Sequence, residues 1–325
     1  MRPNFYFKPL NEADLREVTT IREGELKLGQ TIGCAFDEEH INYVIVGIAE
    51  SIGPQANLGN SGSENAFDAF LKRFLNMQSN EFYDGSDTAI YGKIIQNCTF
   101  ETIDEARQLT AELDVLVEET INSILLKGKI PIVIGGGHNN AFPIIAANFK
   151  ILREEIAVLN LDPHADCRKL EGRHSGNPFS YAFANGYLDT YTVLGLHKSY
   201  NSSFLLDFLI ENNFSFTFFD DYIDHPDLLV NDIQKYSALF EEYPHVGIEL
   251  DMDAIQNMPS SAFSPSGITL EAARFYIKTA SQNPNLRYLH IPEGAPCTAH
   301  EEKIVGKALA YLVWDFLEAR NNISL

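Results

Sequence analysis

Hydrophobic residues along this chain follow two alternating patterns. Short and nearly continuous apolar runs come first, and longer stretches with helical periodicity lie between them, such as residues 66–77, 103–128, 270–280 and 303–320. The apolar runs are INYVIVGIA (41–49), IPIVIG (130–135), IAVLNL (156–161), YTVLGL (191–196), FSFTFF (214–219), HVGIEL (245–250) and LRYLHI (286–291). Apolar strands that alternate with amphipathic helices are typical of a parallel sheet covered on both faces. The pattern therefore predicts an α/β fold of three layers with a mainly parallel central sheet.

Nothing in the sequence divides this pattern into parts. There is no internal repeat, no low-complexity tract and no Pro/Gly/Ser-rich linker, so we expect one domain over residues 1–325, with a polar N-terminal extension at about 1–40. No apolar run approaches the ~18 residues of a membrane span, and no N-terminal segment resembles a signal peptide. Four scattered cysteines without a C-x-x-C pair are typical of a reducing compartment. We expect a cytoplasmic protein with no membrane partner.

The charge balance limits the partners further. The formal net charge is -21, and no basic stripe is available to neutralise phosphates. We therefore expect no nucleic-acid partner. One interpretation of this negative charge is that it keeps the protein soluble. The alternative is that some of the carboxylates bind metal ions, whose positive charge would cancel part of it.

Polar groups that can bind metals follow four of the predicted strands. They are His138 after the first glycine-rich turn, Asp162, His164 and Asp166 after IAVLNL, Asp251 and Asp253 after HVGIEL, and Glu293 after LRYLHI. Ligands of open α/β sheets bind beyond the carboxyl ends of the strands. We therefore expect these side chains to share one site.

Residues 162–166 place three titratable side chains close together. In an extended backbone, Asp162, His164 and Asp166 point to the same side, where they repel or desolvate one another unless something positive lies between them. A metal, an Arg/Lys cluster, or a solvated loop that keeps them apart would each resolve this. The glycines at 135–137 do not form a phosphate loop, because no G-K-[ST] follows, nor a dinucleotide fingerprint. They instead favour close backbone approach around His138.

Two His and four Asp without a thiolate suit hard or borderline divalent ions better than structural zinc. Six such side chains are too many for a single ion that also holds a water molecule, and they fit two ions bridged by carboxylates. Such a pair would lower the pKa of a shared water from ~15.7 towards ~7.

Several motifs in the same order resemble the ureohydrolase family, which contains arginase, agmatinase and formimidoylglutamase. They are GGGH (135–138), DPHAD (162–166), ELDMD (249–253), EGAP (293–296) and the glycine-rich loop GPQANLGNSG (53–62). Together they extend over more than half of the chain. The resemblance implies an arginase-like α/β fold.

The resemblance also implies two Mn²⁺ ions per subunit. One would be held by His138, Asp162, Asp166 and Asp251, and the other by Asp162, His164, Asp251 and Asp253. The reaction it implies is attack of metal-bound hydroxide on an amidine carbon. Asp166 and Glu293 are then candidate catalytic residues, since a carboxylate such as Glu293 can pair with a planar amidine or guanidine cation.

Departures from the family pattern favour its formimidoylglutamase branch. Gly137 stands where arginase and agmatinase usually have Asp, no Asp-Pro follows Asp253, and HSGNPF (174–179) is similar to the S-S-G-T-P-F of formimidoylglutamases. Ser175 occupies the position of the proton-shuttling histidine of the other enzymes. His174, one residue earlier, is the candidate for that task.

Substrate selection is assigned to residues near the second motif. Arg168 lies two residues after Asp166, as in formimidoylglutamase-like sequences, and would bind a substrate carboxylate; the alternative is a salt bridge to one of the many acids. Asn177 is a second candidate contact and Arg173 a weaker one. Glu249 replaces a small hydroxyl residue of the family and is interpreted as an outer acid or a salt-bridge partner. The histidines outside the motifs are interpreted as surface or packing residues: His40, His197, His225, His245, His290 and His300.

The sequence thus predicts a hydrolase of linear amidines that converts N-formimidoyl-L-glutamate to glutamate and formamide. The alternatives are a guanidino hydrolase that releases urea from arginine or agmatine, and a non-catalytic binding or regulatory member of the fold. A phosphoesterase is disfavoured because few basic residues lie near the motifs. The expected partner is a small-molecule substrate. Members of the family often form trimers or hexamers, so a homo-oligomer is possible.

Overall fold

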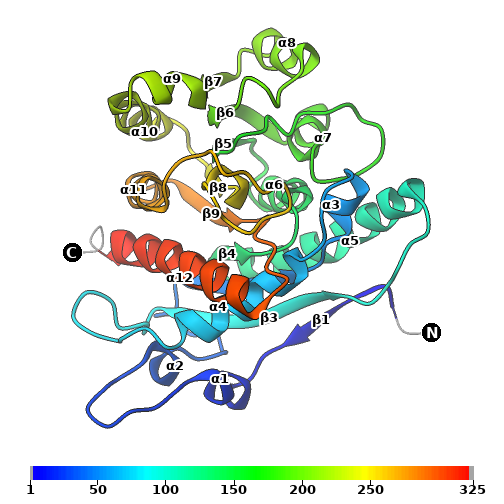
Figure 1. The fold of residues 1–325 in the computed structure, drawn as a ribbon. Helices are drawn as coiled ribbons and strands as arrows, with labels where there is room; N and C mark the ends of the chain where they lie inside the picture. Colours follow the sequence, from blue (N-terminus) through cyan, green and yellow to red (C-terminus); the bar gives the residue numbers. More distant parts are fainter. Residues whose placement is uncertain (1–2, 322–325) are drawn as a thin grey trace.

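A nine-stranded sheet forms the centre of the molecule. The computed structural model describes residues 3–321, and its strands lie in the order β1-β3-β2-β4-β9-β8-β5-β6-β7 (Figure 1). All neighbouring strands are parallel except β1 and β3, which are antiparallel. The strands are β1 (Phe5–Pro9), β2 (Tyr43–Ala49), β3 (Thr88–Gln96), β4 (Ile130–Ile134), β5 (Ile156–Leu161), β6 (Leu188–Leu196), β7 (Ser215–Phe218), β8 (Val246–Leu250) and β9 (Leu286–Ile291).

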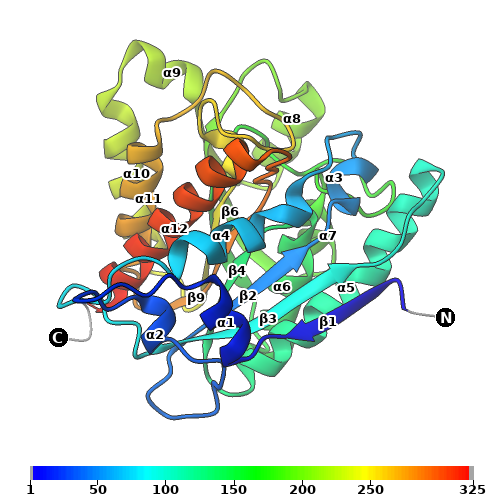
Figure 2. The ribbon, with the colours of Figure 1, turned by 60° about the horizontal axis from the view of Figure 1, so that its bottom comes forward.

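Helices cover both faces of the sheet (Figures 1 and 2). One apolar core contains side chains of α4 (Ala66–Phe74), α10 (Asp227–Phe240), α11 (Leu270–Ala280) and α12 (Ala299–Asn321). The other contains side chains of α3 (Ile52–Ala56), α5 (Ile103–Leu125), α6 (Ala141–Leu152), α7 (Pro178–Ala184) and α8 (Ser203–Glu211). Shorter elements are α1 (Glu12–Val18), α2 (Leu28–Thr31), α9 (Phe219–Asp224), η1 (Ser63–Asn65), η2 (His138–Asn140) and η3 (Met252–Ala254). The expected three-layer α/β architecture is confirmed.

All seven predicted strands are present, as β2 and β4–β9, and two strands were missed. β3 is only partly buried and carries Lys93, so its sequence lacks a continuous apolar run. β1 lies within the segment expected as a polar extension, where Phe5 and, in α1, Leu15 are buried. Strands near an edge need apolar residues on fewer positions, which weakens their signal.

The sheet order brings the motif-bearing strands together. β4, β9, β8 and β5 are consecutive neighbours at its centre. Because parallel strands end at the same edge, the residues that follow these four strands meet above the middle of the sheet. Across residues 3–321, no helix has the length and apolar content that crossing a membrane requires.

Candidate metal centre and active site

Each motif begins where one of the four central strands ends. His138 opens η2 after β4, Asp162 follows β5, Asp251 is the N-cap of η3 after β8, and Glu293 lies two residues after β9. Asp251 accepts the backbone N–H of Asp253 at 2.6 Å, which fixes the turn that carries both carboxylates. The side chains of all five residues are buried.

The turn before His138 is held by a residue that sequence reasoning missed. Glu50, directly after β2, is fully buried and accepts the backbone N–H of Gly137 and the side-chain amide of Asn140, both at 2.7 Å. A Cβ on Gly137 would lie 2.3 Å from Cδ of Pro54, so only glycine fits this close approach. Glu50 could have been found by the strand-end rule that led to the other acids.

His138 faces three carboxylates at once. Its Nδ1 lies 3.1 Å from Oδ2 of Asp162, 3.0 Å from Oδ2 of Asp166 and 3.0 Å from Oδ2 of Asp251. One ring nitrogen carries at most one proton, which cannot satisfy three buried anions. Ligand atoms ~3 Å apart are those of adjacent positions around an ion with bonds of ~2.1 Å. These four residues therefore fit a divalent ion, and their nitrogen and oxygen donors suit hard or borderline ions.

Asp162 links this group to a second one. Its Oδ2 faces His138, while its Oδ1 accepts the backbone N–H of His164 at 2.7 Å and lies 3.6 Å from Nδ1 of the same residue. Nδ1 of His164 is also 3.9 Å from Oδ2 of Asp253. The six predicted ligands thus lie together as two groups that share Asp162.

Burial makes this cluster of acids electrostatically unfavourable without cations. Burial, reinforced by the neighbouring Asp253 and Asp162, holds the pKa of Asp251 well above its usual value. Burial also raises the pKa of Asp166, to which the charge of Asp162 adds. Burial opposes a positive charge on His138, yet its hydrogen bonds to carboxylates raise its pKa well above normal. These directions favour protonated groups in the metal-free site, and bound divalent ions would supply positive charge in place of those protons.

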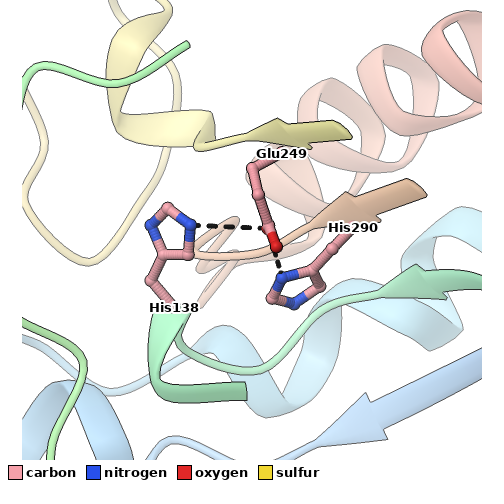
Figure 3. A group of neighbouring side chains, drawn as sticks. All are labelled: His138, Glu249 and His290. Carbon is pink, nitrogen blue, oxygen red and sulfur yellow. Dashed lines mark hydrogen bonds and ion pairs between the residues drawn. The ribbon is translucent and has the colours of Figure 1, made fainter. Parts of the chain in front are cut away.

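Behind His138 lies a buried pair that departs from the family pattern (Figure 3). Oε2 of Glu249 accepts Nδ1–H of His290 at 2.6 Å and lies 3.5 Å from Nε2 of His138. Of the two expectations for His290, the surface position is wrong, because His290 is fully buried; its hydrogen bond to Glu249 was not expected.

The spacing of these three side chains would itself accept an ion, since their ligand atoms lie within 4.8 Å of one another. A histidine that binds an ion through Nδ1, however, carries its proton on Nε2. Nε2 of His138 has no hydrogen-bond partner in the described residues, and the negative charge of Glu249, 3.5 Å away, favours a proton there.

A cavity of about 330 Å³ opens above the cluster. Its lining includes His164, Asp166, Asp251, Asp253 and Glu293. Arg168 is the one Lys or Arg side chain among its lining residues. The Arg168 side chain is 53% exposed, and its Nε forms an ion pair at 3.7 Å with Oε1 of Glu171, which is the salt bridge expected as the alternative to substrate binding. Binding of a substrate by Arg168 stays a prediction.

Glu293 also lines this cavity, and one of its carboxylate oxygens is buried without a partner in the described residues. Its Oε1 accepts the backbone N–H of His138 at 2.6 Å, and its Oε2 has no hydrogen-bond partner in the described chain. Glu293 and Asp166 adopt left-handed backbone conformations, with φ of 69° and 49°. Such conformations cost energy in non-glycine residues and concentrate at functional sites.

Three other predicted site residues lie outside the cavity lining. Nδ1 of the buried His174 accepts the backbone N–H of Gly176 at 3.1 Å, and its Nε2 faces Glu171. Arg173 donates to Asp114 at 2.8 Å and to Oδ1 of Asn177, also at 2.8 Å. These contacts brace the loop after β5, and direct roles of His174, Arg173 and Asn177 at a substrate stay predictions.

Comparison with known proteins decides the family. The arginase family model matches residues 41–318. The chain belongs to the arginase family. Among curated arginase-family relatives, it is 26% identical to the formimidoylglutamase of Macrococcus caseolyticus over 85% of both chains. It is 25% identical to that of Staphylococcus haemolyticus, over 68% of this chain and 66% of that one.

Solved structures of the same family share the fold. The formimidoylglutamase of Bacillus subtilis superposes with a TM-score of 0.77 at 17% identity, over 93% of this chain and 94% of that one. The Trypanosoma cruzi formiminoglutamase with Mn²⁺ gives 0.71 at 20% identity, over 91% of this chain and 98% of that one. The arginase-like fold and the family resemblance are therefore confirmed, with relatives from the formimidoylglutamase branch.

Proposed function

We propose that this arginase-family protein hydrolyses the C–N bond of linear amidines, converting N-formimidoyl-L-glutamate and water to L-glutamate and formamide. The observation that carries the proposal is the combination found in one cavity. Residues of both ligand groups line it, Glu293 lines it with one oxygen that is unpaired in the described residues, and Arg168 is the one Lys or Arg of its lining. The names of the curated relatives support the same substrate.

The metal ligands follow from the two groups. His138, Asp162, Asp166 and Asp251 would hold one Mn²⁺, and Asp162, His164, Asp251 and Asp253 the other, with Asp162 and Asp251 shared. When bound, such ions activate water and polarise the carbon–nitrogen group that it attacks. The negative charge of Glu249, 3.5 Å from Nε2 of His138, would favour a proton on that nitrogen and so leave Nδ1 free as a ligand.

Glu293 is suited to hold the amidine. Its Oε1 is fixed by the backbone of His138, so Oε2 can accept an N–H from the planar amidinium. This contact would keep the amidine carbon above the ligand cluster, which is the positioning that hydrolysis needs.

Asp166 is suited to move protons. Its side chain is 11% exposed to the cavity, whereas the side chains of Asp162 and Asp251 are 0% and 2% exposed. It would accept a proton from the attacking water and deliver it to the nitrogen that leaves with glutamate. The carbon–nitrogen bond to glutamate then breaks, and formamide remains.

Arg168 would bind a carboxylate of the glutamate part. A guanidinium offers two parallel N–H donors, which gives a planar carboxylate both affinity and direction. Substrates without a carboxylate gain nothing from this contact. The cavity therefore favours an acidic amidine over a cationic guanidine such as agmatine.

A substrate panel tests the proposal. The Mn²⁺-loaded protein is given N-formimidoyl-L-glutamate, arginine, agmatine and formamidine, which has no carboxylate, and formamide and urea are both measured. We expect formamide from the first substrate to dominate. For that substrate, Arg168→Gln should raise KM at least ~10-fold, with little effect on formamidine. The matched control is Lys169→Gln, which removes the same charge beside the cavity but not from its lining. Dominant urea release would overturn the proposal in favour of a guanidino hydrolase.

A further inference from the structure

A second cavity is lined by basic residues, whereas the chain as a whole is acidic. It occupies about 480 Å³ between the segment after α1, α4 and α12. Figure 2 shows α4 and α12 side by side, with the N-terminal segment beside them. This cavity shares no lining residue with the candidate active site, so it is a separate feature of the surface.

Its lining is basic although the protein carries a formal net charge of -21. Five cationic side chains from three segments line it, and no Asp or Glu does: Arg22, Lys27, Lys72, Arg73 and Lys307. Such a concentration of one sign of charge raises the local potential for anions.

Two of these cations are already compensated. Lys27 pairs with Glu25, and Lys72 pairs with Glu302 at 3.0 Å. Among residues 3–321, no ion pair is formed by Arg22, Arg73 or Lys307. Three positive charges therefore face the cavity without a carboxylate partner.

Arg73 adds an independent sign of a missing partner. Its Nε is buried, yet it makes no hydrogen bond within the described chain. A buried donor without an acceptor is costly and uncommon in folded proteins. An anion in the cavity would satisfy a guanidinium placed in this way.

The walls are fixed by hydrogen bonds. Oδ1 of Asn76 accepts the backbone N–H of Thr20 at 2.7 Å, and Nδ2 of Asn76 donates to the carbonyl of Val18 at 2.7 Å. These bonds tie the N-terminal segment to the end of α4, so the cations are presented by a braced structure. Met77 and Tyr311 add less polar surface.

We propose that this cavity binds a small molecule that carries a phosphate group. A phosphate dianion matches the uncompensated charge and can accept hydrogen bonds from several cations at once, whereas a single carboxylate uses one guanidinium. The volume leaves room for an organic part against Met77 and Tyr311. The proposal is independent of the amidine hydrolase function.

Binding is tested on the Mn²⁺-loaded protein by calorimetry with AMP, inorganic phosphate and succinate. We expect one AMP per chain, weaker binding of inorganic phosphate, and little binding of succinate. The double variant Arg73→Gln/Lys307→Gln should weaken AMP binding at least tenfold. The matched control Lys235→Gln/Lys303→Gln removes the same charge from residues outside the cavity lining and should change it less than twofold.

A second measurement does not depend on variants. AMP should slow acylation of Lys307 in the unaltered protein, as followed by mass spectrometry. The proposal is overturned if neither AMP nor phosphate binds, if succinate binds as well as AMP, or if the control variant loses as much affinity as the cavity variant. It is also overturned if Arg168→Gln abolishes AMP binding, since the ligand would then occupy the candidate active site.

Discussion

Replacing Glu249 by Gln should weaken the binding of one metal ion. Glu249 lies between His290 and His138, at 2.6 Å and 3.5 Å, and all three side chains are 0% exposed. Gln keeps the volume but removes the charge and turns one oxygen into a donor. The N–H of His290 then loses its charged acceptor, and Nε2 of His138 loses the negative charge 3.5 Å away that favours its protonation.

The size of the effect follows from the contacts. Hydrogen bonds to charged groups contribute about 1.5–3 kcal/mol, and loss of an outer partner of a metal-bound histidine typically lowers metal affinity ~10–100-fold. That ratio corresponds to about 1.4–2.8 kcal/mol. Because the loss acts through His138, it should fall on the ion that His138 holds and spare the one at His164.

Mn²⁺ titration followed by calorimetry and by the EPR signal of free Mn²⁺ measures both sites. Glu249→Gln should lower the affinity of one of two sites by this factor. The matched control is Glu154→Gln, which alters an exposed Glu that lies 3.2 Å from His245 and before β5, at the end of that strand opposite to Asp162. Unchanged affinity of both sites in Glu249→Gln, in protein that melts as a folded chain, would refute this account of the pair.

Three further predictions concern stability. The pKa of His174 is lowered to about 4 by burial and by Arg107 and Arg168. As pH drops, the unfolded chain therefore binds this proton first, so the free energy of unfolding falls between pH ~6.5 and ~4. Urea unfolding of His174→Gln should lack this part of the loss. Burial raises the pKa of Asp251 in the metal-free protein, so the stability of that form should fall as pH rises above ~4, and thermal melts should show that Mn²⁺ reverses the loss. Arg173→Gln leaves the buried Asp114 unpaired and should lower the free energy of unfolding by about 3–5 kcal/mol. The control Lys198→Gln, at the exposed pair with Asp221, should lower it by less than ~1 kcal/mol. Equal losses in the two variants would contradict this prediction.

The convergence of the six ligands could be predicted because it depends on a simple rule. Apolar runs indicated seven strands, and parallel strands deliver the residues after them to one edge. The same rule reaches Glu50 after β2. Strand order could not be predicted, and this is why the contact between His290 and Glu249 was not expected. Glu249 and His290 are register partners on the neighbouring strands β8 and β9, although the two strands are separated by α11 in the sequence.

The loop after β5 shows a second limit. His174, Arg173 and Asn177 were considered for the substrate because of their place in a motif. The chain turns there, and Arg173 reaches Asp114 in α5, far away in sequence. Periodicity predicts which way side chains point in strands and helices. It predicts nothing about irregular loops, whose contacts depend on distant segments.

Formamide release measured against bound metal tests the central claim most directly. The protein is loaded with increasing Mn²⁺, the ions bound per chain are counted, and formamide and glutamate formed from N-formimidoyl-L-glutamate are quantified. The account predicts equal amounts of the two products, with turnover that rises as the second ion binds. Absence of both products from a chain that holds two ions, or urea from arginine as the main activity, would contradict it.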